Sequence, residues 1–250
     1  MAERKSFLNI GVDNLSMEET LEMVEKTIEQ DQQLHHTVVN AGKIVALQTD
    51  TELRKSVNEA DVINADGQAV VWASRFLKKP LKERVAGIDL FVNLLEWAHQ
   101  KGHTIYLLGA KPEVVQTLVD QLSEKYSESL IAGYHHGYFK QEEEKELVQK
   151  IAESGARLLF VAMTSPKKEN FLYRHRETLQ KVNFIMGVGG SFDVLSGKTK
   201  RAPVWMQKAG LEWFYRFLQE PKRMWKRYLI GNTKFVCLVL REKMKKKNKN

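Results

Sequence analysis

Short apolar runs that alternate with amphipathic stretches constrain the fold of this chain more than any other feature of its sequence. The apolar runs, each of a length typical of a buried strand, lie at 36–40, 61–64, 104–108, 130–132, 158–162 and 184–188. Stretches with helical spacing lie near 69–77, 111–125, 141–153 and 168–180. Because strands that alternate with helices form a parallel sheet with right-handed crossovers, the sequence predicts an α/β core with a mainly parallel sheet.

The N-terminal segment is predicted to add a first strand and helix to this core. Leu8, Ile10 and Val12 alternate with less apolar residues, as they would in a strand. The segment Ser16–Glu19 has the pattern of a capping box, so we expect a helix that begins there and runs to about Glu29.

Polar residues and glycines follow several of the predicted strands directly. Asn40 ends one apolar run, and Asp66 comes shortly after another. Gly109, Thr164–Lys168 and Gly189–Asp193 occupy the same position after later runs. Since open α/β sheets bind their ligands in the crevice beyond the carboxyl ends of the strands, we expect these residues to converge on one site.

A glycine turn follows the last apolar run. Phe184–Val188 is typical of a buried strand, and Gly189, Gly190 and Ser191 after it allow a tight turn with backbone N–H groups free to face a ligand. A strand, a glycine turn and a helix start together favour a bound phosphate. An ordinary turn without a ligand explains the same residues, and the pattern alone leaves this alternative open.

Basic residues are concentrated after Ser196. Residues 197–250 contain 16 lysines and arginines and 3 acidic residues, a net charge of +13, whereas residues 1–196 carry a net charge of −5. We therefore divide the chain into an α/β core at 1–196, Rossmann-like in its predicted sheet, and a basic, aromatic-rich helical appendage at 197–250.

The appendage is predicted to associate with a membrane. Pro203–Leu218 has the spacing of an amphipathic helix, and Pro221 begins a second one. Met224–Leu240 mixes aromatic, aliphatic and basic residues as interfacial helices do. The basic residues at 243–249 would each add roughly 1 kcal/mol of attraction to anionic lipid. The alternative is a basic solvated tail behind an ordinary packing helix.

Asp66 is the leading candidate for a general base. It follows a strand and precedes Gly67, which lets a substrate approach, and a carboxylate in such a cleft can accept a proton from a sugar hydroxyl. The local sequence fits equally well a residue that caps the helix after it, so both interpretations stay open.

Patterns typical of a metal site or of a serine hydrolase are missing from the sequence. There is no Asp-x-Asp pair of the kind that holds a metal with a nucleotide diphosphate. His135 and His136 are adjacent, and in an extended chain they would point to opposite faces. Ser191 has no Gly-x-Ser-x-Gly elbow around it. We therefore expect neither a metal nor a cofactor.

The composition favours a soluble globular protein, with 43% apolar and 28% charged residues. The single Cys237 excludes a disulfide framework and favours a reducing compartment. We see no signal peptide, and no run reaches the roughly 18 apolar residues that a transmembrane helix needs. We therefore expect a cytoplasmic protein that lies peripherally on the inner face of the cell membrane.

The chain also contains a series of short motifs. They are Ala65–Gly67, Arg84–Asp89, Leu108–Ala110, Gly137–Phe139, Pro166–Glu169, Met186–Gly190 with Phe192-Asp193, Arg201–Pro203, and Leu211–Trp213 with Tyr215-Arg216. In this combination and order they resemble the WecG/TagA/CpsF family of bacterial glycosyltransferases over nearly the whole chain. The resemblance implies an inverting, metal-independent enzyme that moves a sugar from a UDP-sugar to a polyprenyl-diphosphate-linked sugar at the cytoplasmic membrane face. N-acetylmannosamine in teichoic-acid linkage units is the best-known cargo of this family.

The resemblance also implies roles for individual residues. It makes Asp66 the catalytic residue, and it implies that Asn40, Arg84 and the appendage arginines at 216, 223 and 227 bind substrate. With the residues of the predicted crevice added, the substrate-binding set is Asn40, Arg84, Lys168, Gly189, Gly190, Asp193, Arg216, Arg223 and Arg227.

Two departures from the family pattern leave the donor sugar open. Lys168 stands where many members carry a glutamine expected near the donor sugar, and Asn40 is followed by Ala41–Lys43 rather than by a proline or an acidic residue. Together with Gln219–Pro221, these resemble the branch that serves exopolysaccharides and transfers glucose or a uronic acid.

The interpretation that combines these features is a glycosyltransferase. Asp66 deprotonates the acceptor hydroxyl, the glycine turn with nearby lysine or arginine stabilises the departing UDP, and the appendage arginines pair with the acceptor diphosphate. The donor is N-acetylmannosamine or its uronic acid, with UDP-glucose as the alternative, and the acceptor is undecaprenyl-diphosphate-linked N-acetylglucosamine. A nucleic-acid-binding protein with a basic tail is the alternative from another class. An oxidoreductase is disfavoured, because no Gly-x-Gly-x-x-Gly follows the first strand. The sequence leaves the oligomeric state open, a homo-oligomer included.

Overall fold

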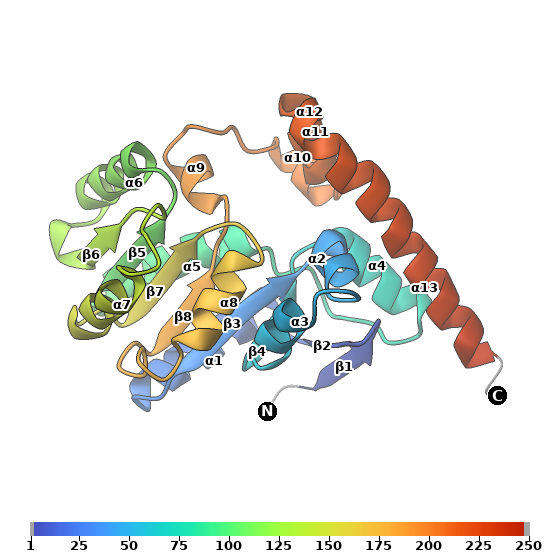
Figure 1. The fold of residues 1–250 in the computed structure, drawn as a ribbon, viewed down its shortest axis with the longest axis horizontal. Helices are drawn as coiled ribbons and strands as arrows, with labels where there is room; N and C mark the ends of the chain where they lie inside the picture. Colours follow the sequence, from blue (N-terminus) through green and yellow to red (C-terminus); the bar gives the residue numbers. More distant parts are fainter. Residues whose placement is uncertain (1–2, 248–250) are drawn as a thin grey trace.

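A six-stranded parallel sheet forms the centre of the molecule (Figure 1). The computed structural model describes the backbone of residues 3–247, and their side chains except at positions 223, 226, 227, 246 and 247. The strand order is β4-β3-β8-β7-β5-β6, and every neighbouring pair is parallel. The strands are β3 (Leu34–Val39), β4 (Val62–Ala65), β5 (Ile105–Gly109), β6 (Ile131–His135), β7 (Leu158–Ala162) and β8 (Phe184–Gly187). The predicted α/β fold with a mainly parallel sheet is confirmed.

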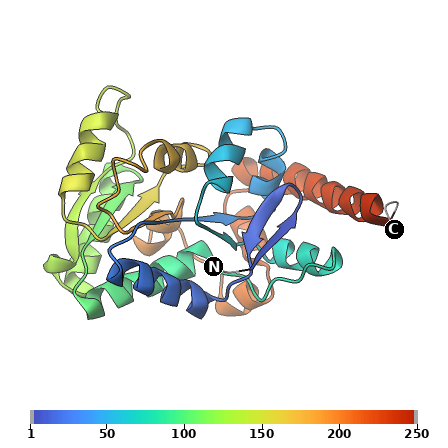
Figure 2. The same ribbon diagram turned by 90° about the horizontal axis from the view of Figure 1, so that it is seen from below.

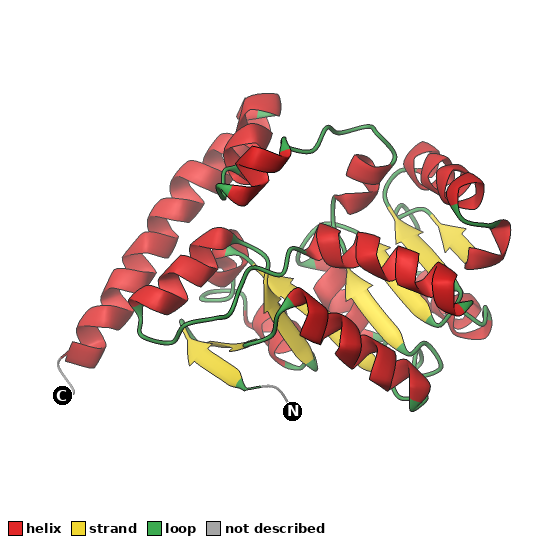
Figure 3. Cartoon of the chain, turned by 180° about the vertical axis from the view of Figure 1, so that it is seen from behind, coloured by secondary structure: helices red, strands yellow, loops and turns green. Residues whose placement is uncertain are grey.

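Helices cover both faces of this sheet. One face packs against α1 (Met17–Glu29), α5 (Gly87–Lys101) and α6 (Pro112–Lys125), and Figure 3 shows this side of the molecule. The other face packs against α7 (Glu144–Glu153) and α8 (Lys167–Arg174). Along β5, Leu107 enters the first cluster while its neighbours Tyr106 and Leu108 enter the second, because successive side chains of a strand point to opposite faces.

The helix α1 begins as predicted, and α5 was not predicted at all. Ser16 and Glu19 form the reciprocal hydrogen bonds of a capping box, 3.1 and 2.8 Å long, at the start of α1. In contrast, the N-cap residue of α5 is Ala86, whose side chain cannot cap the helix, and Gly87 is the first helical residue. Alanine and glycine carry no start signal, so the 15 residues of α5 escaped recognition even though its apolar face is fully buried.

The prediction for the first strand is wrong in its extent and its partner. The strands β1 (Arg4–Phe7) and β2 (Ile10–Asp13) form an antiparallel hairpin outside the six-stranded sheet (Figure 2). Leu8 lies in the turn, where Leu8 and Asn9 have φ values of 52° and 61°. Two positive φ values at the centre of a hairpin are those of a type I′ turn, which matches the twist of the strands it joins.

A further cluster lies at the end of the sheet that carries this hairpin. It contains the hairpin, α2 (Ala41–Ala46), α3 (Thr51–Asn58), α4 (Gln68–Phe76) and one side of the last helix, α13 (Gly231–Lys247). Phe235 and Val239 of α13 are buried in it, and Figure 1 shows α13 running past α2 and α4. Phe235 lies within Met224–Leu240, the segment predicted to lie in a membrane interface, and it belongs instead to the protein core.

The C-terminal portion consists of short helices that lead into α13. They are α10 (Val204–Lys208), α11 (Glu212–Gln219), α12 (Pro221–Trp225) and a π-helical turn at Lys226–Ile230. The single helix predicted for Pro203–Leu218 is wrong, because Gly210 adopts a φ of 72° and separates α10 from α11. The helix predicted from Pro221 is confirmed. Among the described residues, none of the helices combines the length and apolar character needed to cross a bilayer.

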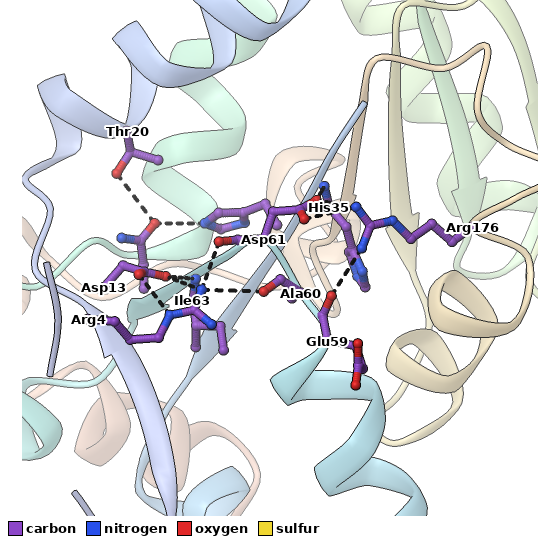
Figure 4. A network of polar contacts seen from close by, with 11 residues as sticks. Arg4, Asp13, Thr20, His35, Glu59, Ala60, Asp61, Ile63 and Arg176 are labelled. Atoms are coloured by element: carbon purple, nitrogen blue, oxygen red, sulfur yellow. Dashed lines mark hydrogen bonds and ion pairs between the residues drawn. The ribbon is translucent and has the colours of Figure 1, made fainter. Parts of the chain in front are cut away.

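Charged side chains tie the hairpin to the amino ends of β3 and β4 (Figure 4). Arg4 donates two hydrogen bonds of 2.9 Å to Asp13, which also accepts the Ile63 N–H at 2.7 Å. Asp61 accepts the His35 N–H at 2.7 Å and pairs with Arg176 at 2.7 Å. This network lies at the amino edge of the sheet, opposite the predicted crevice.

Two buried histidines belong to the same region. His36 is fully buried, and its Nε2 lies 2.8 Å from the Asn64 side-chain oxygen. Burial lowers the pKa of His35 and the pKa of His36 to about 4. Both imidazoles are therefore neutral at physiological pH.

Candidate active site

Asp66 and Asn40 lie side by side at the carboxyl edge of the sheet. The residues before them, Ala65 and Val39, are paired in the sheet, and the Asp66 N–H donates to the Val39 carbonyl at 2.9 Å. An added Cβ on Gly67 would lie 3.3 Å from the Cβ of Asn40, so a glycine here allows the two strand ends to approach closely. The expected convergence of these two residues is confirmed.

The carboxylate of Asp66 contacts the start of α5 rather than the helix that follows it. The Asp66 Oδ1 accepts the Gly87 N–H at 2.9 Å. The helix α4 begins after Gly67 without a side-chain cap, so the interpretation of Asp66 as the cap of α4 is wrong. Within the described residues the Asp66 Oδ2 has no hydrogen-bond partner, and the residue is half-buried. One oxygen is thus held at a helix N-terminus, which favours negative charge, and the other is unpaired among the described residues.

Asn40 has a structural role as well as its place in the crevice. Its Oδ1 accepts the Lys43 N–H at 3.0 Å and so caps α2. Its Nδ2 has no partner among the side chains that the structure describes, which leaves two N–H donors for a ligand.

A glycine turn follows β8 as predicted, but the Gly189 N–H donates to the Val161 carbonyl at 3.4 Å and is not free to face a ligand. Gly189 has a φ of 55°, and a Cβ added to Gly189 or Gly190 would meet no atom within 4 Å. The short helix α9 (Ser191–Leu195) follows, and Asp193 in its first turn lies 3.5 Å from the Lys198 ammonium. The Ser191 hydroxyl donates to the Val188 carbonyl at 2.8 Å. The strand, turn and helix start leave open space over the glycines, as a bound phosphate requires.

Lys168 lies in a buried ion cluster rather than at the surface. The Nζ atoms of Lys168 and Lys43 both lie 2.7 Å from the Glu169 Oε1, and the Lys43 Nζ also donates to the Val38 carbonyl at 2.6 Å. The side chain of Glu169 is 3% exposed and that of Lys168 9%. Since two ammonium groups share one carboxylate, this lysine–glutamate cluster holds one positive charge in excess between α2 and α8.

The charge state of Glu169 follows from these neighbours. Burial alone would raise its pKa, but the two ammonium groups, Lys43 first, hold the pKa of Glu169 well below its usual range. A Cβ on Gly187 would lie 2.8 Å from the Lys168 Cδ, so Gly187 makes room for this lysine beside β8. The cluster therefore lies at the carboxyl end of the strand that leads into the glycine turn.

Arg84 is one of four charged side chains that join the core to the appendage. Arg84 lies 3.2 Å from Glu212 of α11 and 3.8 Å from Asp89 of α5. Arg201 lies 2.6 Å from Asp89 and 3.4 Å from Glu212. The Val85 N–H donates to the Ala65 carbonyl, which places Arg84 next to the end of β4 and hence near Asp66. We call these four residues the appendage ion network.

The appendage arginines are placed only in part. Arg216 follows Glu212 by one helical turn and therefore lies on the same face of α11. Its half-buried side chain has no partner among the described residues. The backbones of Arg223 and Arg227 lie in α12 and in the π-helical turn, but their side chains are outside the described part of the chain.

Several charged residues of this region were not among the predicted site residues. Each of them contacts a predicted site residue or another member of the group, which consists of Lys43, Asp89, Glu169, Arg201 and Glu212. Four of the five lie in one of the short motifs of the family resemblance. The sequence therefore identifies their positions but not the side chains with which they pair. Lys43 had a signal of its own, since it stands three residues after a helix-capping asparagine.

No group of three or more histidine, cysteine, aspartate or glutamate side chains converges as metal ligands do within the described ranges. Contrary to expectation, His135 and His136 do not point to opposite faces, since the centroids of their rings lie 4.4 Å apart. The reason is that β6 ends at His135, so His136 is no longer in an extended strand. The His135 Nδ1 lies 2.8 Å from the His136 carbonyl oxygen. This pair is held by local hydrogen bonding.

An open parallel sheet with polar residues and a glycine turn at its carboxyl edge is an arrangement that binds small ligands in enzymes. The sequence matches the glycosyl transferase WecG/TagA/CpsF family over residues 5–249, so the chain belongs to this family and is a glycosyltransferase. It is 39% identical over 212 residues to the N-acetylglucosaminyldiphosphoundecaprenol N-acetyl-beta-D-mannosaminyltransferase of Bacillus subtilis (strain 168), covering 84% of this chain and 80% of the relative. It is 38% identical over 185 residues to the protein of the same name from Bacillus spizizenii, covering 74% and 70%.

Proposed function

We propose that this protein transfers N-acetylmannosamine, or its uronic acid, from a UDP-sugar to undecaprenyl-diphosphate-linked N-acetylglucosamine with inversion at the anomeric carbon. The observation that carries the proposal is the 39% identity, over 84% of the chain, to a relative whose name specifies this sugar and this acceptor. The product would enter teichoic acid or exopolysaccharide biosynthesis. A glucosyltransferase acting on a lipid-linked exopolysaccharide intermediate is the alternative from the sequence, and no described contact favours it.

In the proposed mechanism Asp66 is the general base. Its Oδ1 is held by the Gly87 N–H, so its Oδ2 takes the proton from the attacking hydroxyl of the acceptor. The oxygen then attacks the anomeric carbon from the face opposite to UDP, which inverts the configuration. Asn40 next to Asp66 donates an amide N–H to one of the two sugars.

Backbone amides and cations take the place of a metal at the departing UDP in this proposal. The Gly190 N–H has no partner among the described residues, whereas the Gly189 N–H donates to the Val161 carbonyl at 3.4 Å. Arg84 approaches from the end of β4. The excess positive charge of the lysine–glutamate cluster lies beside the same strand end. Preorganised donors of this kind stabilise developing negative charge without reorganisation.

The acceptor would be held by the appendage. Arg216, Arg223 and Arg227 pair with its diphosphate, since guanidinium groups bind phosphate in a bidentate way. The basic residues at 243–249 attract anionic lipid, so the protein works as a peripheral protein on the inner face of the cell membrane.

A transfer assay with purified protein tests this proposal. UDP-N-acetylmannosamine, its uronic acid and UDP-glucose are each supplied with a polyprenyl-diphosphate-linked N-acetylglucosamine, with and without EDTA. We expect transfer from the first or second donor, a β-linked product and full activity in EDTA. Transfer from UDP-glucose alone, or an absolute need for Mg²⁺ or Mn²⁺, would overturn the corresponding part of the proposal.

A further inference from the structure

The short helices of the appendage border an open apolar hollow. It lies between α11, the end of α12, the π-helical turn and the start of α13, and its volume is about 400 Å³. Its lining includes Trp213, Phe217, Trp225, Tyr228, Leu229 and Thr233. Volumes of this order are those of ligand pockets.

The aromatic side chains of this hollow are ordered against each other but open to solvent. The rings of Trp213 and Tyr228 lie 5.6 Å apart and join α11 to the π-helical turn. Trp213 is 42% exposed, Trp225 44% and Leu229 70%. Apolar side chains gathered around a hollow and left this exposed mark a binding surface.

Positive charge borders the hollow on α11. Arg216 directly precedes Phe217 and follows Trp213 by three residues, so its side chain lies next to the aromatic face of the helix. It has no partner among the described residues. An apolar hollow with an unpaired cation at its edge fits an amphiphile whose anionic head adjoins its apolar chain.

We propose that this hollow binds the first isoprene units of the polyprenyl diphosphate acceptor, an inference that rests on the acceptor of the proposed function. In a prenyl diphosphate the branched apolar chain begins one bond away from the phosphate ester oxygen, so chain and charge can occupy the hollow and Arg216 together. A glycerolipid places a polar glycerol ester between its phosphate and its acyl chains, which separates the two. The limited volume takes up only the start of a long chain, and the remainder continues into the bilayer.

Binding of soluble prenyl diphosphates to the full chain tests the assignment. Tryptophan emission, which Trp213 and Trp225 report, is titrated with inorganic pyrophosphate, geranyl diphosphate and farnesyl diphosphate. We expect the affinity to rise with chain length, by at least about tenfold from pyrophosphate to the farnesyl compound, since each buried methylene strengthens binding. Farnesyl diphosphate that binds no more tightly than pyrophosphate would overturn the assignment.

Two variants locate the effect, and calorimetry with the same ligands removes the dependence on tryptophan emission. Thr233→Trp fills the hollow, and Leu229→Asp places a charge at its mouth on a side chain that is 70% exposed and tolerant of change. Both should lose the chain-length effect and retain the affinity for pyrophosphate. Val236→Trp, at a 54% exposed position of α13 outside the lining, is the matched control and should bind as the wild type does. An undiminished chain-length effect in both hollow variants contradicts the proposal.

Lysophosphatidic acid distinguishes the two sources of an apolar chain. If this lipid binds as tightly as farnesyl diphosphate and its binding is lost in the same variants, the hollow is a site for bilayer lipid and the prenyl assignment is wrong. The titrations contain no UDP-sugar, so they are independent of the transfer assay. If affinity rises with chain length but the protein has no transferase activity, the assignment of the hollow stands and the proposed function is refuted. If the protein transfers the sugar but affinity does not rise with chain length, the proposed function stands and the assignment of the hollow is refuted.

Discussion

The two carboxylate oxygens of Asp66 lie in different surroundings, and this difference makes a specific test possible. Asp66→Asn keeps an oxygen that can accept the Gly87 N–H, so the fold and the affinity for UDP should be retained. The substituted residue cannot take a proton, so kcat should fall by roughly 10² to 10⁴, the usual contribution of a positioned general base. Steady-state transfer rates and UDP calorimetry measure the two effects. Full activity of the asparagine variant would refute the assignment.

Asp66→Ala serves as the control for the structural role of Asp66, the hydrogen bond to the start of α5. It removes both oxygens, so it should lose activity to the same extent and also destabilise the start of α5. We expect a loss on the order of 1 kcal/mol in the free energy of unfolding, the contribution of one hydrogen bond, which the asparagine variant should not show.

Lys168 offers a test of the donor sugar. Lys168→Gln leaves Lys43 and Glu169 as a neutral buried pair, so it removes the excess positive charge while the carboxylate keeps a partner. If that charge attracts a uronate carboxylate, the affinity for a UDP-uronate should fall by about ten- to a hundredfold, which corresponds to a charge-assisted hydrogen bond of about 1.5 to 3 kcal/mol. The affinity for the neutral UDP-sugar should change much less.

Calorimetry with the two donors measures this difference, and Lys167→Gln at the exposed neighbouring lysine is its matched control. An equal change of affinity for both donors would show that Lys168 does not select a uronate.

The buried histidines make stability depend on pH. The pKa of His35 and that of His36 are about 4 in the folded protein, against about 6.5 in an unfolded chain. Between pH 6.5 and 4 the unfolded state therefore binds more protons, so the free energy of unfolding falls as the pH is lowered through this window. The loss amounts to about 3 kcal/mol per histidine at its lower end.

Urea denaturation at pH 7.5, 6 and 5 measures this effect. Glu169, whose pKa lies below its usual range, acts in the same direction but only from about pH 5 downward, where the glutamate of an unfolded chain begins to bind a proton. A His35→Gln variant should show a weaker dependence on pH. A free energy of unfolding that stays constant from pH 7.5 to 5 would contradict the prediction.

At the scale of elements, the apolar patterns predicted the strands of the sheet but not the features that depend on backbone conformation or on tertiary contacts. All six strands of the parallel sheet were recognised, because each is an apolar run bounded by turn residues. Asp66 and Asn40 could be placed together because parallel strands end at one edge. In contrast, the turn at Leu8 and the break at Gly210 depend on backbone conformations that periodicity does not report.

The partners of the site residues were beyond local sequence for the same reason. Glu212 is 128 residues from Arg84, and no pattern within either segment identifies the other. Phe235 was assigned to a membrane interface on its composition, although it packs into the core, because an apolar side of a helix has the same sequence whichever surface covers it.

The appendage ion network should hold α11 against the core. Arg201→Gln and Asp89→Asn each remove one charge of the ion pair whose side chains lie 2.6 Å apart, and each should raise the KM for the lipid acceptor while UDP affinity is retained. Because the two residues act together, the double variant should be little worse than either single one, with a coupling free energy of roughly 1 kcal/mol.

Hydrogen exchange of residues 204–219 provides a readout that is independent of activity, and protection there should fall in both single variants. Lys150→Gln removes an exposed pair on α7 and serves as the control without effect. Additive losses in the double variant would show that Arg201 and Asp89 act separately.

At the scale of the whole molecule, removing the appendage separates two functions that we propose for the chain. A protein ending at Ser196 keeps all six strands, so we expect it to fold and to bind UDP. It lacks Phe235 and Val239, whose burial contributes roughly 1.5 to 3 kcal/mol each, so its melting temperature should be lower than that of the full chain. It should transfer no sugar to a lipid-linked acceptor.

Co-sedimentation with anionic vesicles compares the two proteins. The full chain should pellet, less so as salt rises because surface attraction is screened within about 8 Å at physiological ionic strength. A part of the binding should persist through the exposed Trp225 and Leu229. Equal pelleting of both proteins, or transfer by the shortened one, would show that the basic end is only a solvated tail.

The contact between the hairpin turn and α13 has a consequence for how the molecule forms. The Leu8 N–H donates to Glu242 at 2.6 Å across 234 residues of sequence. During synthesis the hairpin therefore leaves the ribosome long before the helix that carries Glu242. Contacts of such long range form late, since loop closure must precede them. Until α13 arrives, the apolar cluster at this end of the sheet lacks Phe235 and Val239, so part of its surface stays exposed in the nascent chain.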